Sequence, residues 1–141
     1  MRSRDRNPLV SDVLRVLANE DSLEIFSVVA IKKKVDTKTL RYSQSFGELT
    51  NKQYYTRLQD LAKLNLVKRV EGSLLLTSFG AVVYHGKIKI DNAIDEYYNL
   101  KAVDSFEKIN EMDQNVRHEL IKNIVHDEGI KKVLLGENFK S

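Results

Sequence analysis

Apolar side chains recur every three or four residues along much of the chain, which is the spacing of amphipathic helices. The pattern predicts helices over residues 8–18, about 20–34, 51–63, about 78–106, 113–125 and 130–135. Residues 35–49 are less regular. Residues 37–45 are compatible with a short helix, and a turn is expected at Ser45-Phe46-Gly47, with Phe46 and Leu49 anchored in the core.

The helix over residues 51–63 has the clearest division between its two faces. Thr50 is a favourable N-cap, and Asn65 tolerates the left-handed conformation that often ends a helix. The apolar face consists of Tyr54, Leu58, Leu61 and Ala62, and the opposite face of Lys52, Thr56, Gln59 and Lys63. We therefore expect this helix to be buried on one side and exposed on the other.

Two short apolar segments follow this helix. Residues 66–70 and 73–76 flank Glu71-Gly72, a pair suited to a tight turn. A β-hairpin is therefore predicted immediately after the amphipathic helix. The expected fold class is mainly α with a small β-hairpin.

Composition limits the classes of protein that remain. The 141 residues contain no cysteine, so the chain has no disulfide and no thiol chemistry. No apolar run approaches the length of a membrane span, and the basic start is not followed by a long apolar segment. We expect a cytoplasmic protein without a secretory signal or a membrane partner.

Charge is distributed unevenly along the chain. Residues 31–70 contain ten basic and three acidic side chains, whereas residues 91–128 contain ten acidic and four basic ones. A basic segment suits a polyanion, and the acidic segment is then a separate module. The lysines at 32–34 have two interpretations, because cations also stabilise the C-terminal end of a helix.

An amphipathic helix with a polar, basic face followed by a hairpin is the arrangement of a DNA recognition helix and its wing. Asn51 and Gln53 suit adenine edges, Lys52 and Arg57 suit guanine or phosphate, and the Tyr55 and Thr56 hydroxyls suit phosphate. Lys68 and Arg69 alternate on the first hairpin strand, so they point to opposite faces, and we favour Arg69 as the DNA contact. For Tyr54 we favour core packing, with its hydroxyl at the edge, over a DNA contact.

Three segments resemble archaeal winged helix-turn-helix transcriptional regulators. They are Leu-Thr-Asn-Lys-Gln-Tyr-Tyr-Thr-Arg-Leu at 49–58, Leu-Ala-Lys-Leu-Asn-Leu-Val-Lys-Arg at 61–69, and Leu-Leu-Leu-Thr-Ser-Phe-Gly at 74–80. Residues 91–105 also resemble the long helix that follows the wing in some of these proteins, so the resemblance covers roughly residues 19–105. It implies a winged helix-turn-helix fold with a C-terminal helical extension, and double-stranded DNA binding, commonly as a homodimer.

Patterns for catalysis and metal binding are missing from the sequence. His85, His118 and His126 do not have the spacing of a zinc motif, and there is no glycine-rich phosphate loop or nucleophile elbow. The adjacent acidic pairs at 95–96 and 127–128 diverge on a helix, so we expect them to be solvated. The sequence therefore predicts no enzymatic activity, no cofactor and no metal.

The predicted organisation has three parts. Residues 1–18 form an N-terminal tail and helix, residues 19–80 the winged helix-turn-helix DNA-binding domain, and residues 81–141 a helical extension. Ile90, Ile94 and Tyr97 form an apolar stripe that would pair two chains, unless residues 113–135 fold back to cover it.

The predicted function is that of a sequence-specific double-stranded DNA-binding transcriptional regulator that acts as a homodimer. The alternative is a winged-helix protein-interaction module that does not recognise DNA directly.

Overall fold

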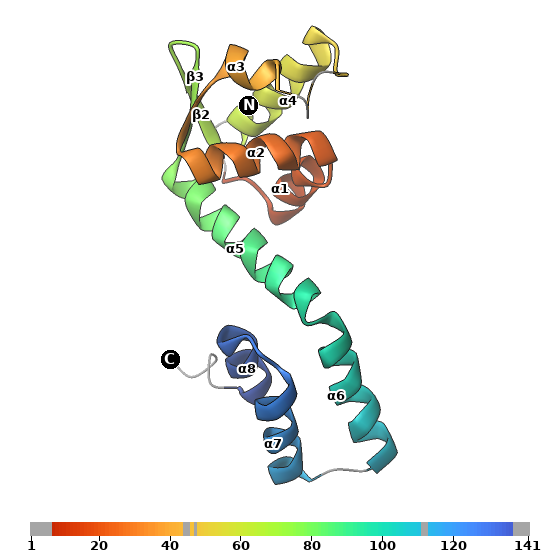
Figure 1. The fold of residues 1–141 in the computed structure, drawn as a ribbon. Helices are drawn as coiled ribbons and strands as arrows, with labels where there is room; N and C mark the ends of the chain where they lie inside the picture. The colour runs from red at the N-terminus through yellow and green to blue at the C-terminus, as the bar shows by residue number, and fades with distance from the viewer. Residues whose placement is uncertain (1–6, 44–45, 47, 111–112, 137–141) are drawn as a thin grey trace. The chain divides into compact units, whose positions relative to one another are not determined.

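The computed structural model describes residues 7–43, 46, 48–110 and 113–136 (Figure 1). The described chain is mainly helical, with one small antiparallel sheet. In chain order the elements are α1 (Val10–Leu17), α2 (Glu20–Lys32), β1 (Lys34–Asp36), α3 (Thr37–Arg41), α4 (Asn51–Lys63), β2 (Val67–Val70), β3 (Ser73–Leu76), α5 (Ser78–Asp95), α6 (Tyr97–Asn110), α7 (Gln114–Ile124) and α8 (Glu128–Leu135). The chain divides into two compact units, residues 1–85 and 86–141, and each is described by itself.

The sheet of the first unit has three strands, one more than the sequence pattern indicated. Its order is β1-β3-β2, and β3 is antiparallel to both neighbours. Strand β1 was missed because it has three residues, of which only Val35 is buried. Its pairing with β3 defines it, with Val35 opposite the buried Leu74. The hairpin is as predicted, and Glu71 and Gly72 both have positive φ (48° and 81°), as a tight two-residue turn requires.

The lysine run at 32–34 is divided between two elements. Asn19 begins α2, because its side chain accepts a hydrogen bond from the Ser22 N–H at 3.0 Å. Lys32 is the last helical residue and Lys33 ends the helix with a φ of 71°, whereas Lys34 already belongs to β1. One lysine therefore lies in the last turn of α2, as the dipole interpretation expects.

Within residues 35–49, helix α3 covers residues 37–41 and is thus shorter than the expected helix over residues 37–45. Asp36 caps α3 by accepting from the Thr39 N–H at 2.9 Å, and the helix ends at Arg41. Phe46 is almost completely buried and Leu49 packs against the core, as predicted. Ser45 and Gly47, the other residues of the expected turn, lie outside the described residues.

The core of the first unit lies where α2 and α4 pack against each other and against one face of the sheet. Its buried members are Ile25, Phe26, Val29, Val35, Leu40, Phe46, Tyr54, Leu58, Leu61, Leu66, Val67 and Leu74. Helix α5 begins against this core. A Cβ on Gly80 would lie 2.0 Å from the carbonyl oxygen of Leu66, so glycine is required for this close approach.

The second unit has a smaller core, formed where α7 folds back onto α6. Val103, Ile121 and Val125 are buried there, with Leu100 and Ile130 among the partly buried side chains around them. Asp113 and Asp127 are the N-caps of α7 and α8, and Gly136 ends α8 with a φ of 81°.

The predicted continuous helix over residues 78–106 is interrupted at Glu96, which separates α5 from α6. The Glu96 N–H is shared between the carbonyl oxygens of Asn92 and Ala93, at 3.2 Å each. Within the described part of the chain, no helix has both the length and the apolar character needed to cross a membrane.

Candidate nucleic-acid interface

Helix α4 carries most of the DNA contacts expected from the sequence. It begins with a reciprocal cap, in which the Thr50 hydroxyl accepts from the Gln53 N–H at 3.0 Å and Gln53 Oε1 accepts from the Thr50 N–H at 2.9 Å. Tyr54, Leu58 and Leu61 are completely buried, because their spacing places them on one side of the helix. The helix is thus held at its start and along one side.

The opposite side of α4 is polar and exposed, and we call it the outer face. It consists of Lys52, Thr56, Gln59 and Lys63. None of these four side chains makes a hydrogen bond or an ion pair with any residue that the structure describes. The outer face therefore offers two positive charges, a hydroxyl and a complete amide to a ligand.

Unlike the side chains of the outer face, the two amides in the first turn of α4 already make hydrogen bonds within the protein. Both Asn51 and Gln53 are exposed, but each carbonyl oxygen accepts a hydrogen bond from the protein itself. Asn51 Oδ1 accepts from Arg41 Nε at 3.2 Å, and Gln53 Oε1 accepts from the Thr50 N–H. Their NH₂ groups remain as donors for a ligand.

Arg41 is a residue of this region that the sequence did not single out. Its Nη1 donates to the carbonyl oxygen of Phe46 at 2.9 Å and its Nη2 to that of Leu49 at 2.5 Å. The guanidinium also lies 5.6 Å from the centre of the Tyr54 ring. Arg41 therefore joins α3 to the segment that leads into α4, and its donors are directed into the protein.

The two tyrosines of α4 differ in burial. Tyr54 is a core residue, as predicted, but its hydroxyl is also buried and donates to the carbonyl oxygen of Thr37 at 2.8 Å. Burial raises the pKa of Tyr54 to about 12. Tyr55 is half-buried, and its ring lies edge-on to Tyr54 with the centroids 5.0 Å apart. Only the Tyr55 side chain of this pair can reach a ligand.

The hairpin places Lys68 and Arg69 on opposite faces of the sheet. Lys68 is opposite Leu75, whereas Arg69 is opposite Leu74, which is buried. Directly opposed residues share a face, so Arg69 is on the side that faces the helices. The Arg69 guanidinium lies 5.8 Å from the centre of the Tyr55 ring, and a cation–π contact thus joins the hairpin to α4.

Arg57 lies at the edge of α4 and not on its outer face. Its side chain is half-buried, and its Nε is buried without a hydrogen-bond partner in the described structure. The sequence predicts that Arg57 contacts guanine or phosphate, and the structure partly encloses its side chain. Among the predicted contacts of α4, Lys52 and Thr56 are both exposed and make no hydrogen bond or ion pair within the described chain, so their polar groups are available to a ligand.

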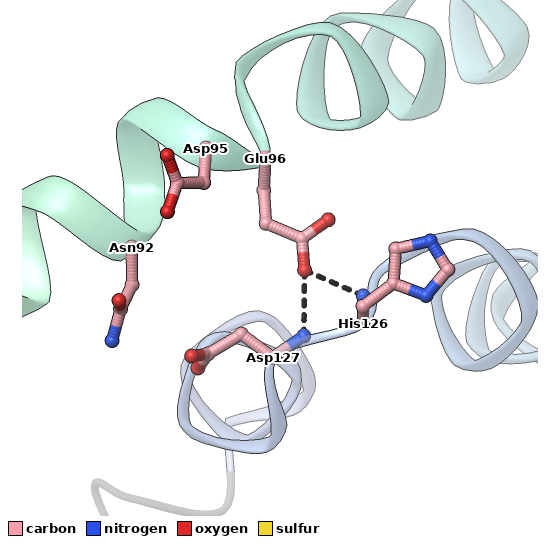
Figure 2. Close-up of a pocket in the computed structure, with 5 residues that line it drawn as sticks. All are labelled: Asn92, Asp95, Glu96, His126 and Asp127. Carbon is pink, nitrogen blue, oxygen red and sulfur yellow. Dashed lines mark hydrogen bonds between the residues drawn. The ribbon is translucent and has the colours of Figure 1, made fainter.

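The second unit contains an open pocket (Figure 2). Asn92, Asp95 and Glu96 line it from α5 and its end, and His126 and Asp127 line it from the connection between α7 and α8. Glu96 is 5% exposed, and its Oε2 accepts from the backbone N–H groups of His126 and Asp127 at 2.5 and 2.6 Å. This carboxylate was expected to be solvated, so the expectation was wrong.

The surroundings of Glu96 keep it ionised. A hydrogen bond from Asn99 Nδ2 to Oε1, at 2.8 Å, lowers the pKa of Glu96 most. The N–H groups of Asp127 and His126 lower it further, against burial, which raises it. No group of three or more metal-ligating side chains occurs within the described residues. By accepting the N–H groups of His126 and Asp127, Glu96 links the end of α5 to the start of α8.

The predicted dimerisation stripe is accessible. The exposed fractions of Ile90, Ile94 and Tyr97 are 58%, 63% and 53%. Helices α7 and α8 do fold back within the second unit, but they bury Val103 of α6 and leave these three side chains uncovered.

No protein-family model matches the chain, and neither the curated proteins nor the solved structures include a significant match.

Proposed function

We propose that this protein is a sequence-specific double-stranded DNA-binding transcriptional regulator of the winged helix-turn-helix class. Helix α4 is the recognition helix and the β2–β3 hairpin is the wing. The observation that carries the proposal is the outer face of α4, which is exposed, basic and unpaired within the described chain while the opposite side is locked in the core. A helix with these two sides can enter the major groove without losing its packing.

Two further observations support the proposal. The element order α2-β1-α3-α4-β2-β3, with the sheet order β1-β3-β2, places a hairpin directly after α4. The contact between Arg69 and Tyr55 keeps this hairpin beside the helix. Residues 31–70 also carry ten basic and three acidic side chains, the balance that a phosphate backbone attracts.

The proposal is tested by the salt dependence of duplex binding. Wild-type protein should bind double-stranded DNA more weakly as salt increases, because phosphate contacts release counterions. Replacing Lys52 and Lys63 with Ala should weaken binding and reduce the log–log salt slope by about two units, roughly one for each lost phosphate contact. Fluorescence anisotropy with a labelled duplex measures both quantities.

The matched control is the double variant Lys122→Ala and Lys132→Ala. It has the same change in charge, and both lysines are exposed in the second unit. This control should bind like wild type. Equal losses in the two double variants would mean that only total charge matters, and absence of salt-dependent binding by wild type would refute the proposal.

The second unit supports the homodimer part of the proposal. Ile90 and Ile94 of α5 and Tyr97 at the start of α6 are all more than half exposed, and exposed apolar patches mark interfaces. Two-fold pairing would cover the stripe and present two recognition helices to one duplex. The same stripe also favours the alternative of a protein-interaction module, which predicts a wild-type protein that binds no duplex.

A further inference from the structure

Three side-chain amides lie on the exposed part of α4, those of Asn51, Gln53 and Gln59, and their hydrogen bonds indicate which of them can recognise a base. This inference rests on the proposed DNA-binding function. The adenine edge in the major groove presents N7 as an acceptor and the N6 amino group as a donor. An Asn or Gln side chain matches this edge only when its carbonyl oxygen and its NH₂ group both face the base. An Asn or Gln of α4 can therefore recognise adenine only if its side-chain carbonyl oxygen is not already bound within the protein.

Asn51 and Gln53 do not meet this condition. Arg41 Nε and the Thr50 N–H are donors without acceptor capacity, so the atoms that face them must be the amide oxygens. Arg41 also donates to the carbonyl oxygens of Phe46 and Leu49. Moving its guanidinium away from Asn51 would therefore break these hydrogen bonds as well. Both oxygens are thus held against the protein. The NH₂ groups that remain can donate to a phosphate oxygen, a contact that carries no sequence information.

Gln59 meets the condition. It is exposed on the outer face, and its amide makes no hydrogen bond with any described residue. It lies three residues after Thr56 and four before Lys63, so these side chains project from the same side of α4 on successive turns. When a helix lies in the major groove, side chains that project from the same side of it face the groove together.

We propose that Gln59 is the specificity-determining amide of α4 and that it recognises an adenine. Asn51 and Gln53 contribute donor contacts that position the helix and do not select a base pair. This assignment differs from the expectation based on the sequence, in which the amides of the first turn were the adenine contacts.

The test compares base preferences. Wild-type protein is used to select duplexes from a randomised library, and the preference at each position is then measured by sequencing. Gln59→Ala should reduce the preference for adenine at one position by ~5- to 150-fold, the range for loss of a bidentate pair, and should leave other positions unchanged. Asn51→Ala should lower affinity for all sequences without changing the profile. Gln114→Ala, an exposed glutamine of α7, is the matched control and should have no effect.

Each other result overturns the assignment. An unchanged profile for Gln59→Ala, loss of a preference for a different base, or loss of the adenine preference in Asn51→Ala would each show that Gln59 does not recognise adenine. A wild-type protein that binds duplexes without base preference would overturn both the Gln59 assignment and the sequence specificity in the proposed function, while DNA binding itself would stand. If the wild-type protein showed no salt-dependent binding to duplex DNA, the proposed function itself would be refuted. Circular dichroism of each variant checks that it is folded.

Discussion

Arg41 connects several parts of the candidate interface through its guanidinium. Its three nitrogens contact Phe46, Leu49 and Asn51, and its guanidinium lies beside the Tyr54 ring. This set of contacts uses the planar fork of the guanidinium, which a lysine ammonium cannot reproduce. The contacts fix the segment before α4 and the orientation of the Asn51 amide.

We therefore expect Arg41→Lys to destabilise the protein although the charge is kept. The loss of charge-assisted hydrogen bonds should lower the free energy of unfolding by about 1–3 kcal/mol, measured by chemical denaturation. Arg15→Lys is the control, because Arg15 is exposed and, among the described residues, pairs with Asp12 alone. Its effect should stay within about 0.5 kcal/mol. An Arg41→Lys variant as stable as wild type would show that the fork is not needed.

Among the elements, the connection between α5 and α6 depends on Glu96. The sequence pattern predicted one helix through this point, and backbone hydrogen bonds do continue on both sides, from Glu96 N–H to Asn92 and from Leu100 N–H to the Glu96 carbonyl oxygen. The interruption coincides with a buried carboxylate that accepts hydrogen bonds from the connection between α7 and α8 (Figure 2). The second unit is thus held at one end by Glu96 and along its helices by its small core.

The lowered pKa of Glu96 predicts acid sensitivity of the second unit. The ordinary pKa is 4.5 and the folded value is lower, so the stabilisation is present above about pH 4.5 and is lost as the pH falls through the folded value. Thermal unfolding monitored by circular dichroism from pH 7 to about pH 3 measures this loss. Glu96→Gln should be less stable at pH 7, by about 1–3 kcal/mol, because a neutral amide loses the charge-assisted hydrogen bonds and its NH₂ group would face the NH₂ donor of Asn99.

The same variant should also show a weaker pH dependence than wild type. Glu119→Gln, on the exposed side of α7, is the control and should keep both the stability and the pH profile of wild type. If Glu96→Gln and wild type lost stability in parallel on acidification, another carboxylate would be responsible.

For the molecule as a whole, the open question is what covers the apolar stripe of the second unit. Ile90, Ile94 and Tyr97 are more than half exposed, although α7 and α8 fold back onto α6. The charge of residues 91–128, with ten acidic and four basic side chains, disfavours contact between this unit and DNA. A second copy of the chain therefore suits the stripe better than a nucleic acid does.

We expect Ile90→Glu with Ile94→Glu to convert a dimer into a monomer in sedimentation experiments at micromolar concentration. Affinity for duplex DNA should fall as well, because only one recognition helix would then bind each duplex. The control is Val116→Glu with Val133→Glu, two apolar residues of α7 and α8 that are each 49% exposed; it should remain a dimer. Wild-type protein that sediments as a monomer would contradict the homodimer.

Elements whose signals are local were predictable from the sequence. The start of α4 at Thr50, the hairpin turn at Glu71-Gly72 and the start of α7 at Asp113 each depend on residues within four positions of one another. The periodic burial of Tyr54, Leu58 and Leu61 follows from helix geometry alone. The sequence therefore determined most helices, the hairpin and the buried side of α4.

Only the tertiary structure decided the features that depend on partners distant in the chain. Strand β1 exists because β3 pairs with it, and Glu96 is buried because the connection some thirty residues later supplies two N–H donors. The orientation of the Asn51 amide depends on Arg41, ten residues earlier. Periodicity and caps carry no information about such pairs, since a hydrogen bond between distant residues is set by how the packed core brings their backbones together.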